Sequence, residues 1–364
     1  MSKNKNILEF CLSPDLGGLE LCVMENFRYF STKVDTKLIV APNEKLDNFV
    51  DDKNKSTIKR NKLFPIFPAI KLAKFIDDNN IDIIHFHWTR DIATVVFAKL
   101  FSKKKPQIIQ SRHMRITRFK DDFYHKWLYK NINTIHAVTK QLKEQLERFI
   151  PKSVRPKIQH IYLGVKETKI DDKLVEYLRV KYKLEDSFVV GIVGRIEEGK
   201  GQHIVIDAMK KLKESNIKVL IIGNVMDEKY LESLKAKVSD MGLENRVIFT
   251  GFTKDVNEHI KLCDVSVLAT PMETFGLVVI ESMINKVCVT ATNKGGPLEI
   301  IDDKVDGLLF DRTSDDLAKK IKLLYDDPHY KEKISSNAYD KAKVKFDFKK
   351  QNEELYKVMQ GMKD

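Results

Sequence analysis

Cysteine is scarce in this chain of 364 residues. The four cysteines, Cys11, Cys22, Cys263 and Cys288, form no C-x-x-C pair. So few cysteines, none of them in such a pair, exclude a disulfide scaffold and a zinc ribbon. The composition is typical of a protein in a reducing compartment.

Long apolar runs are also missing. The longest candidate, residues 92–101, is interrupted by Lys99 and is much shorter than the roughly 20 residues of a membrane-spanning helix. The first residues contain a short apolar run without a cleavage-site pattern, which predicts a first strand rather than a signal peptide. We therefore expect a cytoplasmic protein, either free or in peripheral contact with the inner face of the membrane.

Glycine and proline are too few for a collagen-like or low-complexity chain, at 15 and 10 residues. The composition is 43% hydrophobic and 32% charged, as expected for a folded globular protein. At roughly 150 residues per domain, the length suggests two domains.

The positive charge is unevenly distributed. The formal net charge is +12, yet residues 1–165 contain 30 basic and 17 acidic side chains, whereas the remainder is nearly balanced. Such asymmetry indicates that one domain faces an anionic partner, for example a phospholipid surface, a phosphorylated acceptor or nucleic acid. A lysine-rich surface without a specific partner is the alternative.

Short β-branched runs alternate with longer helical periodicities in both halves, which predicts an α/β protein with parallel sheets. The expected strands are residues 6–11, 37–41, 81–85, 107–110, 134–138, 188–193, 218–222, 247–250, 265–268, 287–290 and 307–310. The expected helices include residues 19–30, 68–79, 92–101, 140–150, 202–215, 227–241, 256–263 and 277–285. The segment 151–183 interrupts the series, so we predict two doubly wound domains that join near residue 168.

Two glutamates flank a predicted strand-to-helix loop, in ETFGLVVIE. Glu273 lies at the carboxyl edge of the sheet, where ligands of such sheets bind. Gly276 and Leu277 then offer free amide groups at the helix start. Glu281 lies within an apolar helix, where its carboxylate needs a partner, such as the diol of a ribose or a local lysine or backbone group.

A second strand-to-helix loop, GRIEEGKG, carries two cations. Arg195 and Lys200 lie among glycines that let backbone approach a ligand closely, an arrangement that suits a diphosphate. The spacing does not match a Walker A loop. Surface cations on an ordinary turn are the alternative.

Two further segments contain glycine pairs. GGPLE places Gly295 and Gly296 before a probable helix, and SPDLGGLE places Gly17 and Gly18 after the first strand. The full G-x-G-x-x-G pattern is absent, so a nicotinamide dinucleotide is not indicated.

Taken together and in this order, these segments resemble the family-four retaining glycosyltransferases, also called glycosyl transferases group 1, which have the GT-B fold. The matching pieces are the glycine pair in SPDLGGLE, the segment IIHFHW, GRIEEGKG, the E-x(7)-E motif ETFGLVVIE, and GGPLEI followed by DGLLF. The resemblance implies two Rossmann-like domains that face each other across a cleft. It implies an N-terminal acceptor-binding domain over residues 1–168, with a C-terminal helix at about 346–364 packed on it, and a donor-binding domain over residues 169–345.

The resemblance also implies roles for single residues. Arg195 and Lys200 would hold the donor diphosphate, Glu273 the transferred sugar and Glu281 the ribose. The remaining donor-binding residues that it implies are Gly17, Gly18, Gly223, Gly251, Phe252, Phe275, Gly276 and Leu277.

Histidines complete the candidate site. His113 matches the family's histidine near the transferred sugar, which implies a catalytic-site role. Alternation places His85 and His87 on one face of a strand, and we expect one to be buried and His87 to reach the cleft. No D-x-D motif or metal-ligand spacing occurs, so we expect no metal and no other cofactor, with Arg195 and Lys200 supplying the positive charge.

The expected reaction is retaining transfer of a sugar from a nucleotide-diphosphate sugar, with UDP as the favoured nucleotide, to a glycan or lipid-linked acceptor of cell-surface polysaccharide or lipopolysaccharide. The alternatives are a GT-B epimerase or sugar phosphorylase, an inactive sugar-nucleotide sensor and a nucleic-acid-binding protein, although no nucleic-acid motif is present.

The chain also departs from the family at the domain junction, where it has Leu163-Gly164-Val165-Lys166 in place of Asn-Gly-Val-Asp.

Residues 101–130 combine nine cations with Phe119, Phe123, Tyr124 and Trp127. This mixture suits a membrane interface with anionic lipid, or an anionic acceptor. Core aromatics beside solvated cations are the alternative.

Overall fold

The computed structural model describes residues 4–61, 64–212 and 216–362. The chain divides into two compact units, which we describe separately. Unit 1 comprises Met1–Leu163 and Lys349–Asp364, and unit 2 comprises Gly164–Phe348.

Unit 1 is built on a seven-stranded parallel sheet with the order β3-β2-β1-β4-β5-β6-β7. Its strands are β1 (Ile7–Cys11), β2 (Thr36–Val40), β3 (Lys55–Thr57), β4 (Ile83–Phe86), β5 (Gln107–Arg112), β6 (Thr134–Ala137) and β7 (Lys157–His160). Every residue of β1 and β4 is buried, as expected of central parallel strands that are covered on both faces.

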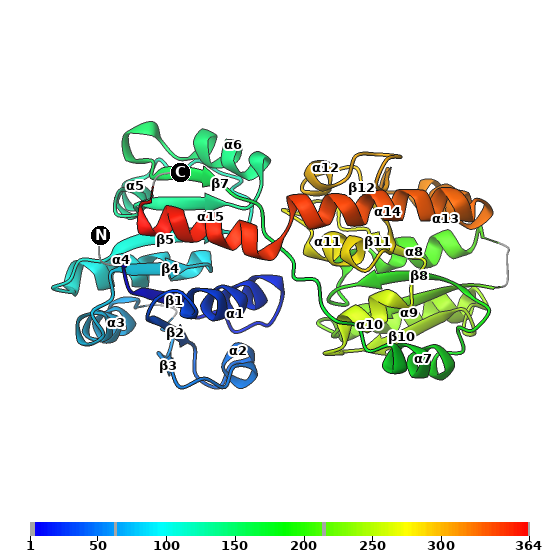
Figure 1. The fold of residues 1–364 in the computed structure, drawn as a ribbon, viewed down its shortest axis with the longest axis horizontal. Helices are drawn as coiled ribbons and strands as arrows, with labels where there is room; N and C mark the ends of the chain where they lie inside the picture. The colour runs from blue at the N-terminus through cyan, green and yellow to red at the C-terminus, as the bar shows by residue number, and fades with distance from the viewer. Residues whose placement is uncertain (1–3, 62–63, 213–215, 363–364) are drawn as a thin grey trace. The chain divides into compact units, whose positions relative to one another are not determined.

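Helices cover both faces of this sheet (Figure 1). They are α1 (Gly18–Ser31), α2 (Lys45–Phe49), α3 (Ile66–Asp78), α4 (Ile92–Phe101), α5 (Phe123–Lys130), α6 (Lys140–Phe149) and α15 (Phe348–Gln360), with short 3-10 turns at Thr89–Asp91 and Lys152–Val154. The C-terminal helix α15 packs within unit 1, where Tyr356 stacks on Phe30 and the Tyr29 hydroxyl donates to Glu353 over 2.6 Å.

Unit 2 repeats the architecture with six parallel strands in the order β10-β9-β8-β11-β12-β13. Its strands are β8 (Phe188–Val193), β9 (Ile217–Ile222), β10 (Val247–Gly251), β11 (Val265–Leu268), β12 (Cys288–Thr292) and β13 (Leu308–Phe310). Its helices are α7 (Asp172–Lys181), α8 (Gln202–Met209), α9 (Glu228–Asp240), α10 (Val256–Lys261), α11 (Leu277–Ile284), α12 (Pro297–Ile300), α13 (Ser314–Asp326) and α14 (Pro328–Lys345), with a 3-10 turn at Glu198–Lys200.

The chain enters and leaves unit 2 through two adjacent segments. The Val165 N–H donates to the Phe346 carbonyl over 2.9 Å, and Val165 pairs with Asp347 as an isolated bridge. A Cβ on Gly164 would lie 2.5 Å from the Phe348 Cα, so only glycine fits this contact. Unit 2 begins at Gly164, a few residues before the predicted join of the two domains at residue 168.

The predicted fold class is confirmed as an α/β protein of two parallel-sheet units. Each predicted strand has a counterpart within two residues at either end. The prediction missed the short edge strands β3 and β7, and it made the helix from residue 202 too long. That helix ends at Met209, after which Lys210, Lys211 and Leu212 make i→i−3 bonds that tighten the last turn; residues 213–215 of the prediction lie outside the described residues.

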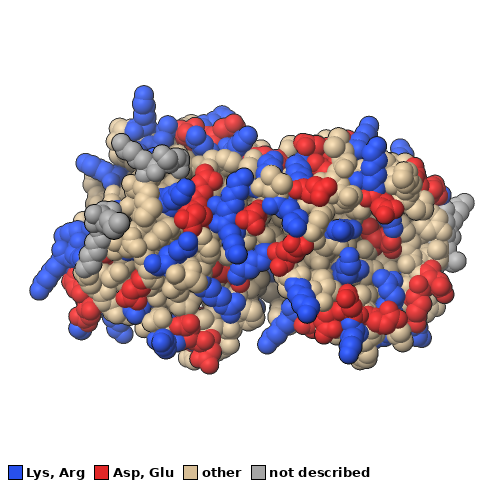
Figure 2. Space-filling model, viewed as in Figure 1, with Lys and Arg blue, Asp and Glu red and all other residues tan. Residues whose placement is uncertain are grey.

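On the face shown in Figure 2, basic and acidic side chains are interspersed in both units. The excess of basic residues therefore forms no uninterrupted patch on that face. None of the helices in the described part of the chain combines the length and apolarity that crossing a bilayer requires.

Candidate active site

Each unit has a topological switch point, where the strand order reverses. It lies between β1 and β4 in unit 1 and between β8 and β11 in unit 2. In open parallel sheets, ligands bind outside the carboxyl ends of the strands at this point. The loops GRIEEGKG and ATPMETFG follow β8 and β11, so the fold itself brings the two loops of unit 2 together.

Lys200 and Glu273 meet at this edge. The Lys200 Nζ lies 3.3 Å from the Glu273 Oε2, and each side chain is about one quarter exposed, at 25% and 24%. Both side chains can therefore contact a ligand while they remain close enough to attract each other. Lys200 is therefore paired with Glu273 and is not an isolated surface cation.

Two close backbone contacts fix the loop that carries Glu273. The Gly296 N–H donates to the Glu273 carbonyl over 2.9 Å, and Glu273 pairs with Gly295 as an isolated bridge. A Cβ would lie 2.3 Å from the Glu273 carbonyl oxygen on Gly295 and 2.3 Å from the Phe275 carbonyl oxygen on Gly296. Side chains at these two positions would push the loops apart, which explains the glycine pair.

Arg195 stands at the start of the β8 loop. Its guanidinium pairs with Glu197 over 2.8 Å, and its side chain is 44% exposed. The buried Gln202 amide donates to the Arg195 carbonyl over 2.9 Å, which holds the backbone of this turn. The Arg195 side chain is thus partnered within its own loop.

Helix α11 begins directly after Glu273. Gly276 precedes it with φ of 104°, a conformation that favours glycine, and Leu277 is its first residue. Phe275 is buried, and its ring lies 6.0 Å from that of Phe346. The free amide groups of the helix start therefore lie beside the Lys200–Glu273 pair.

Glu281 lies one turn into α11. Among the described residues, its carboxylate has neither a hydrogen-bond nor an ion-pair partner. Burial raises the pKa of this carboxyl group to about 7. An unpartnered carboxylate of this kind is suited to a ligand that donates hydrogen bonds.

The other predicted donor-binding residues of unit 2 follow neighbouring strands. The Gly223 N–H donates to the Gly251 carbonyl over 3.1 Å, which joins the ends of β9 and β10. Phe252 follows and is 59% exposed. An aromatic ring at this position can stack on a planar ligand.

Gly17 and Gly18 lie in unit 1, at the start of α1. Gly17 is the N-cap residue, and its N–H donates to the Glu20 carboxylate over 2.9 Å, as in a capping box. A phosphate contact of these glycines stays a prediction.

His113 follows β5 and is partly buried, and its Nε2 lies 3.0 Å from the His87 Nδ1. His85 and His87 share one face of the sheet, as predicted, with ring centroids 4.3 Å apart. We expected His87 to reach the cleft, but only 1% of this residue is accessible and it is buried like His85. The ring that contacts His87 from the loop is that of His113.

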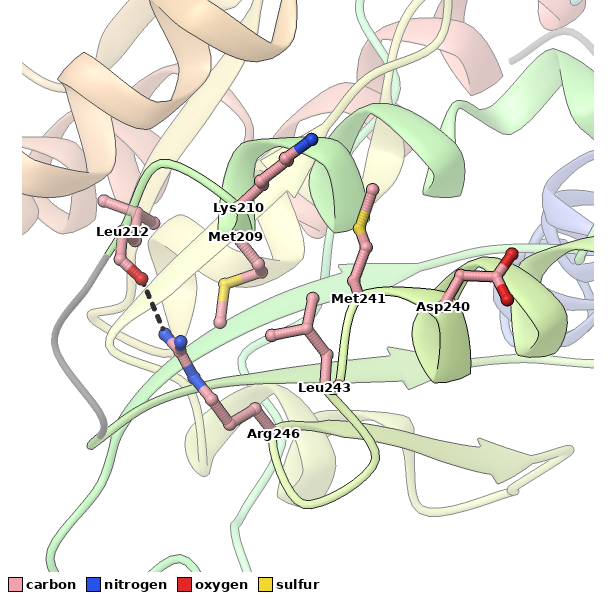
Figure 3. A pocket seen from close by; sticks show the side chains of 8 residues that line it. Met209, Lys210, Leu212, Asp240, Met241, Leu243 and Arg246 are labelled. Atoms are coloured by element: carbon pink, nitrogen blue, oxygen red, sulfur yellow. Dashed lines mark hydrogen bonds between the residues drawn. The ribbon is translucent and has the colours of Figure 1, made fainter.

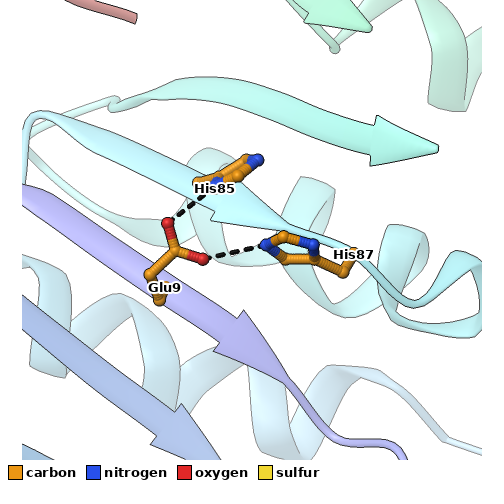
Figure 4. Close-up of side chains that lie close together, drawn as sticks. All are labelled: Glu9, His85 and His87. Carbon is orange, nitrogen blue, oxygen red and sulfur yellow. Dashed lines mark hydrogen bonds and ion pairs between the residues drawn. The ribbon is translucent and has the colours of Figure 1, made fainter. Parts of the chain in front are cut away.

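Both buried histidines contact Glu9 of β1 (Figure 4). One ligand atom from each of Glu9, His85 and His87 lies within 4.8 Å of the others, a spacing that a metal ion could use. The sequence alone does not reveal this group, because Glu9 lies far from the histidines along the chain.

Sequence reasoning missed two buried acids of unit 1. Glu9 is fully buried in the apolar strand ILEFC, and Asp91 is 1% exposed and accepts the Leu12 N–H over 2.9 Å. Burial raises the pKa of Asp91 to about 7. The sequence does contain a signal for both acids, because Glu9 stands alone within an apolar strand and Asp91 precedes an apolar helix. A carboxylate in such a place needs hydrogen-bond partners.

A pocket in unit 2 lies away from these loops (Figure 3). It is lined by Met209, Lys210, Leu212, Asp240, Met241, Gly242, Leu243 and Arg246. These residues lie beside the amino ends of β9 and β10, and the Arg246 guanidinium donates to the carbonyls of Leu212 and Ile217. The pocket therefore belongs to the opposite edge of the sheet.

Comparison with known families accounts for this geometry. The family model described as Glycosyl transferases group 1 matches residues 176–341, and that described as Glycosyltransferase Family 4 matches residues 17–169. The chain belongs to this family of glycosyltransferases.

Three relatives illustrate the likeness. An uncharacterised glycosyltransferase of Methanocaldococcus jannaschii is 27% identical over 62% of this chain and 60% of its own length. The N-acetylgalactosamine-N,N'-diacetylbacillosaminyl-diphospho-undecaprenol 4-alpha-N-acetylgalactosaminyltransferase of Campylobacter jejuni is 24% identical over 92% of this chain and 96% of its own length. The structure of Anabaena Alr3699/HepE in complex with UDP-glucose has a TM-score of 0.87 at 20% identity and covers 98% of this chain and 100% of its own. The last likeness establishes the GT-B fold.

The pKa of Glu281 generates a prediction about stability. The folded pKa of about 7 lies above the ordinary value of 4.5, so the folded state holds its proton longer than the unfolded state. The free energy of unfolding of the wild type should therefore fall, relative to that of Glu281→Gln, as the pH rises from about 4.5 to 7. Above pH 7, the difference between the two proteins should stay constant. Thermal unfolding of both proteins between pH 4.5 and 8.5 measures this, and parallel curves would contradict the assigned pKa.

Proposed function

We propose that the protein transfers a sugar, with retention of anomeric configuration, from a UDP-sugar to a glycan or lipid-linked acceptor of cell-surface polysaccharide or lipopolysaccharide. The observation that carries the proposal is the Lys200–Glu273 pair, 3.3 Å apart, beside the start of α11 at the switch point of unit 2. This arrangement combines a cation, free amide groups and a carboxylate, which are the groups that a diphosphate and a sugar require.

In this proposal, unit 2 holds the donor. Lys200 and the start of α11 bind the diphosphate together with Arg195, and Glu273 accepts hydrogen bonds from the sugar hydroxyls. Glu281 accepts hydrogen bonds from the ribose, which gives its unpartnered carboxylate two donors. Gly223, Gly251 and Phe252 hold the base, and UDP is favoured by analogy with the similarly folded protein that was solved with UDP-glucose.

The proposed mechanism depends on leaving-group stabilisation. Cleavage of the anomeric bond passes through an oxocarbenium-like state while negative charge develops on the diphosphate. The Lys200 ammonium and the amide groups at Leu277 lie where they can stabilise that charge, the role a divalent ion plays in other enzymes. We therefore propose a metal-independent reaction in which the departing diphosphate oxygen takes the proton of the attacking hydroxyl.

The acceptor side is assigned to unit 1, where His113 would contact the transferred sugar. We propose that α3, α4 and α5, which lie on the same side of unit 1 in Figure 1, contact an anionic membrane surface that presents a lipid-linked acceptor. Their exposed apolar side chains are here called the α3–α5 surface and comprise Ile66, Phe67, Ile70, Leu100, Phe101, Phe123 and Tyr124.

The exposure of these side chains supports the membrane contact. Phe123 is 87% exposed and Phe67 is 65% exposed, which is costly in water and favourable at headgroup depth. Lys71, Lys74 and Lys126 are exposed on the same helices, and each adds about 1 kcal/mol of attraction near anionic lipid. The relative from Campylobacter jejuni, by its name, uses an undecaprenol-linked acceptor.

Lys200→Ala and Glu273→Gln test the donor site. Each should reduce turnover by about 10²–10³-fold, because each removes a group that contacts the reacting part of the donor. Release of UDP from a panel of UDP-sugars in the presence of bacterial lipid-linked acceptors measures this turnover. Release only when an acceptor is present distinguishes transfer from epimerisation.

The matched control is Lys235→Ala, which removes an exposed lysine of α9 outside the site. Its turnover should equal that of the wild type. The donor-site proposal fails if Lys200→Ala and Glu273→Gln behave like this control.

Co-sedimentation with vesicles tests the membrane contact. The full chain should bind vesicles that contain phosphatidylglycerol and not vesicles of phosphatidylcholine alone, because the α3–α5 surface combines apolar and basic groups. The double substitution Phe67→Ser/Phe123→Ser should weaken binding at least tenfold.

Tyr177→Ser is the control for this measurement, since it removes an aromatic side chain of α7 in unit 2 that is 61% exposed. Equal binding to both kinds of vesicle, or equal loss in the control, would remove the membrane proposal.

A further inference from the structure

A row of polar side chains crosses the buried sheet of unit 1. Glu9 of β1 lies opposite His85 of β4, and Ser111 of β5 lies opposite His136 of β6. These four side chains are at most 2% exposed. Together with His87, they form one chain of hydrogen bonds that ends at a backbone carbonyl on one side and at His113 on the other.

The carbonyl end fixes the direction of the bonds. The His136 Nε2 lies 2.7 Å from the Ile161 carbonyl oxygen, which can only accept, so Nε2 carries a proton. Burial lowers the pKa of His136 to about 3, so the ring is neutral and its Nδ1 is an acceptor. The Ser111 hydroxyl therefore donates to that Nδ1 over 2.7 Å and accepts from the His85 Nε2 over 2.7 Å.

Glu9 is the centre of the chain of bonds. Burial raises its pKa, but the electrostatic attraction to His85 and the hydrogen bonds from His85 and His87 outweigh burial and hold the pKa below its ordinary value. As a carboxylate, Glu9 accepts from the His85 Nδ1 over 2.6 Å and from the His87 Nε2 over 2.9 Å. The His87 ring therefore carries its proton on Nε2.

The other arm reaches His113. Burial lowers the pKa of His87 to about 4, so its ring is neutral and its Nδ1 accepts. The His113 Nε2, 3.0 Å away, must then donate. Burial also holds the pKa of His113 well below its usual value, so its Nδ1 keeps a lone pair, to which no described residue donates a hydrogen bond.

We propose that Glu9 is a positioning residue that, through His87, holds His113 as the Nε2–H tautomer with Nδ1 as a hydrogen-bond acceptor for a hydroxyl group of the transferred sugar. The sugar's place rests on the proposed function, whereas the tautomer rests on the buried hydrogen bonds together with the neutral state of His87. A neutral acceptor nitrogen suits a sugar hydroxyl, which can donate to it without a change of charge.

Metal ligation is the competing explanation for Glu9, His85 and His87. Two ligands bound to one tetrahedral ion at 2.0–2.1 Å lie about 3.3 Å apart. The separations of 2.6 and 2.9 Å are shorter and are those of charge-assisted hydrogen bonds. The geometry therefore favours shared protons over a shared ion.

NMR of the full chain labelled with 15N-histidine tests the proposal, because long-range 15N–1H spectra distinguish protonated from unprotonated ring nitrogens. His113→Gln assigns the signal. We expect a protonated Nε2 and an unprotonated Nδ1 in His113 at pH 7. An Nδ1–H tautomer or an imidazolium in the wild type would overturn the proposal.

Two variants of Glu9 isolate its role. Glu9→Gln keeps an oxygen for His87 and offers an N–H to His85, so the His113 tautomer should persist. Glu9→Met removes the acceptor, so His87 can exchange tautomers and the His113 signals should shift toward a mixture. Unchanged His113 signals in Glu9→Met, with circular dichroism showing a folded chain, would refute the positioning role.

Ser111→Ala is the matched control, since it breaks the other arm of the same buried chain and should leave the His113 signals unchanged. Altered signals in this control would mean that the His113 signals report general packing, and the proposal would fail.

Elemental analysis of the purified chain tests metal ligation directly. A stoichiometric transition metal would overturn the proposal, because the metal would replace the hydrogen-bond network. Once transfer is established, turnover should fall about tenfold in Glu9→Met relative to Glu9→Gln. A chain without transfer activity but with the expected tautomer would refute the proposed function and leave the tautomer assignment standing.

Discussion

Backbone-to-backbone contact between the loops of unit 2 is the constraint on which the candidate site depends. The segment after β12 approaches the Glu273 loop so closely that Gly295 and Gly296 leave no room for a side chain. A Cβ on Gly201, at the end of the Lys200 turn, would likewise lie 2.6 Å from the Ala269 carbonyl oxygen. The loops that carry Lys200 and Glu273 are therefore locked to their neighbours, and the pair is positioned before any ligand arrives.

The two units treat buried charge differently. In unit 1, the carboxylate of Glu9 is bonded on both oxygens, and the hydrogen-bond chain ends at a carbonyl group. In unit 2, the Glu281 carboxylate stands without a partner among the described residues. A fully bonded network rigidifies a fold, whereas an unpartnered polar group in a binding region is available to a ligand. This contrast supports a donor site in unit 2 and a preformed histidine in unit 1.

Sequence patterns predicted the strands well because buried parallel strands are largely apolar, as in β8. The short edge strands β3 and β7 have weak apolar signals, so they could be found only from their neighbours. The sequence placed Lys200 and Glu273 in two separate strand-to-helix loops, and their contact follows from the structure, in which both loops follow central strands of one sheet. Glu9 could not be linked to His85 and His87 from the sequence, because that contact depends on the pairing of β1 with β4. The burial of His87 depends on the same pairing.

Thermal unfolding of the full chain with UDP, GDP, ADP or CMP tests the central claim most directly. A ligand that binds only the folded chain stabilises it by about 2.7 kcal/mol at a hundredfold excess over its dissociation constant. The account predicts a clear rise of the unfolding temperature with UDP and smaller rises with the other nucleotides. No rise with any nucleoside diphosphate at millimolar concentration would contradict a donor site at Lys200 and Glu273.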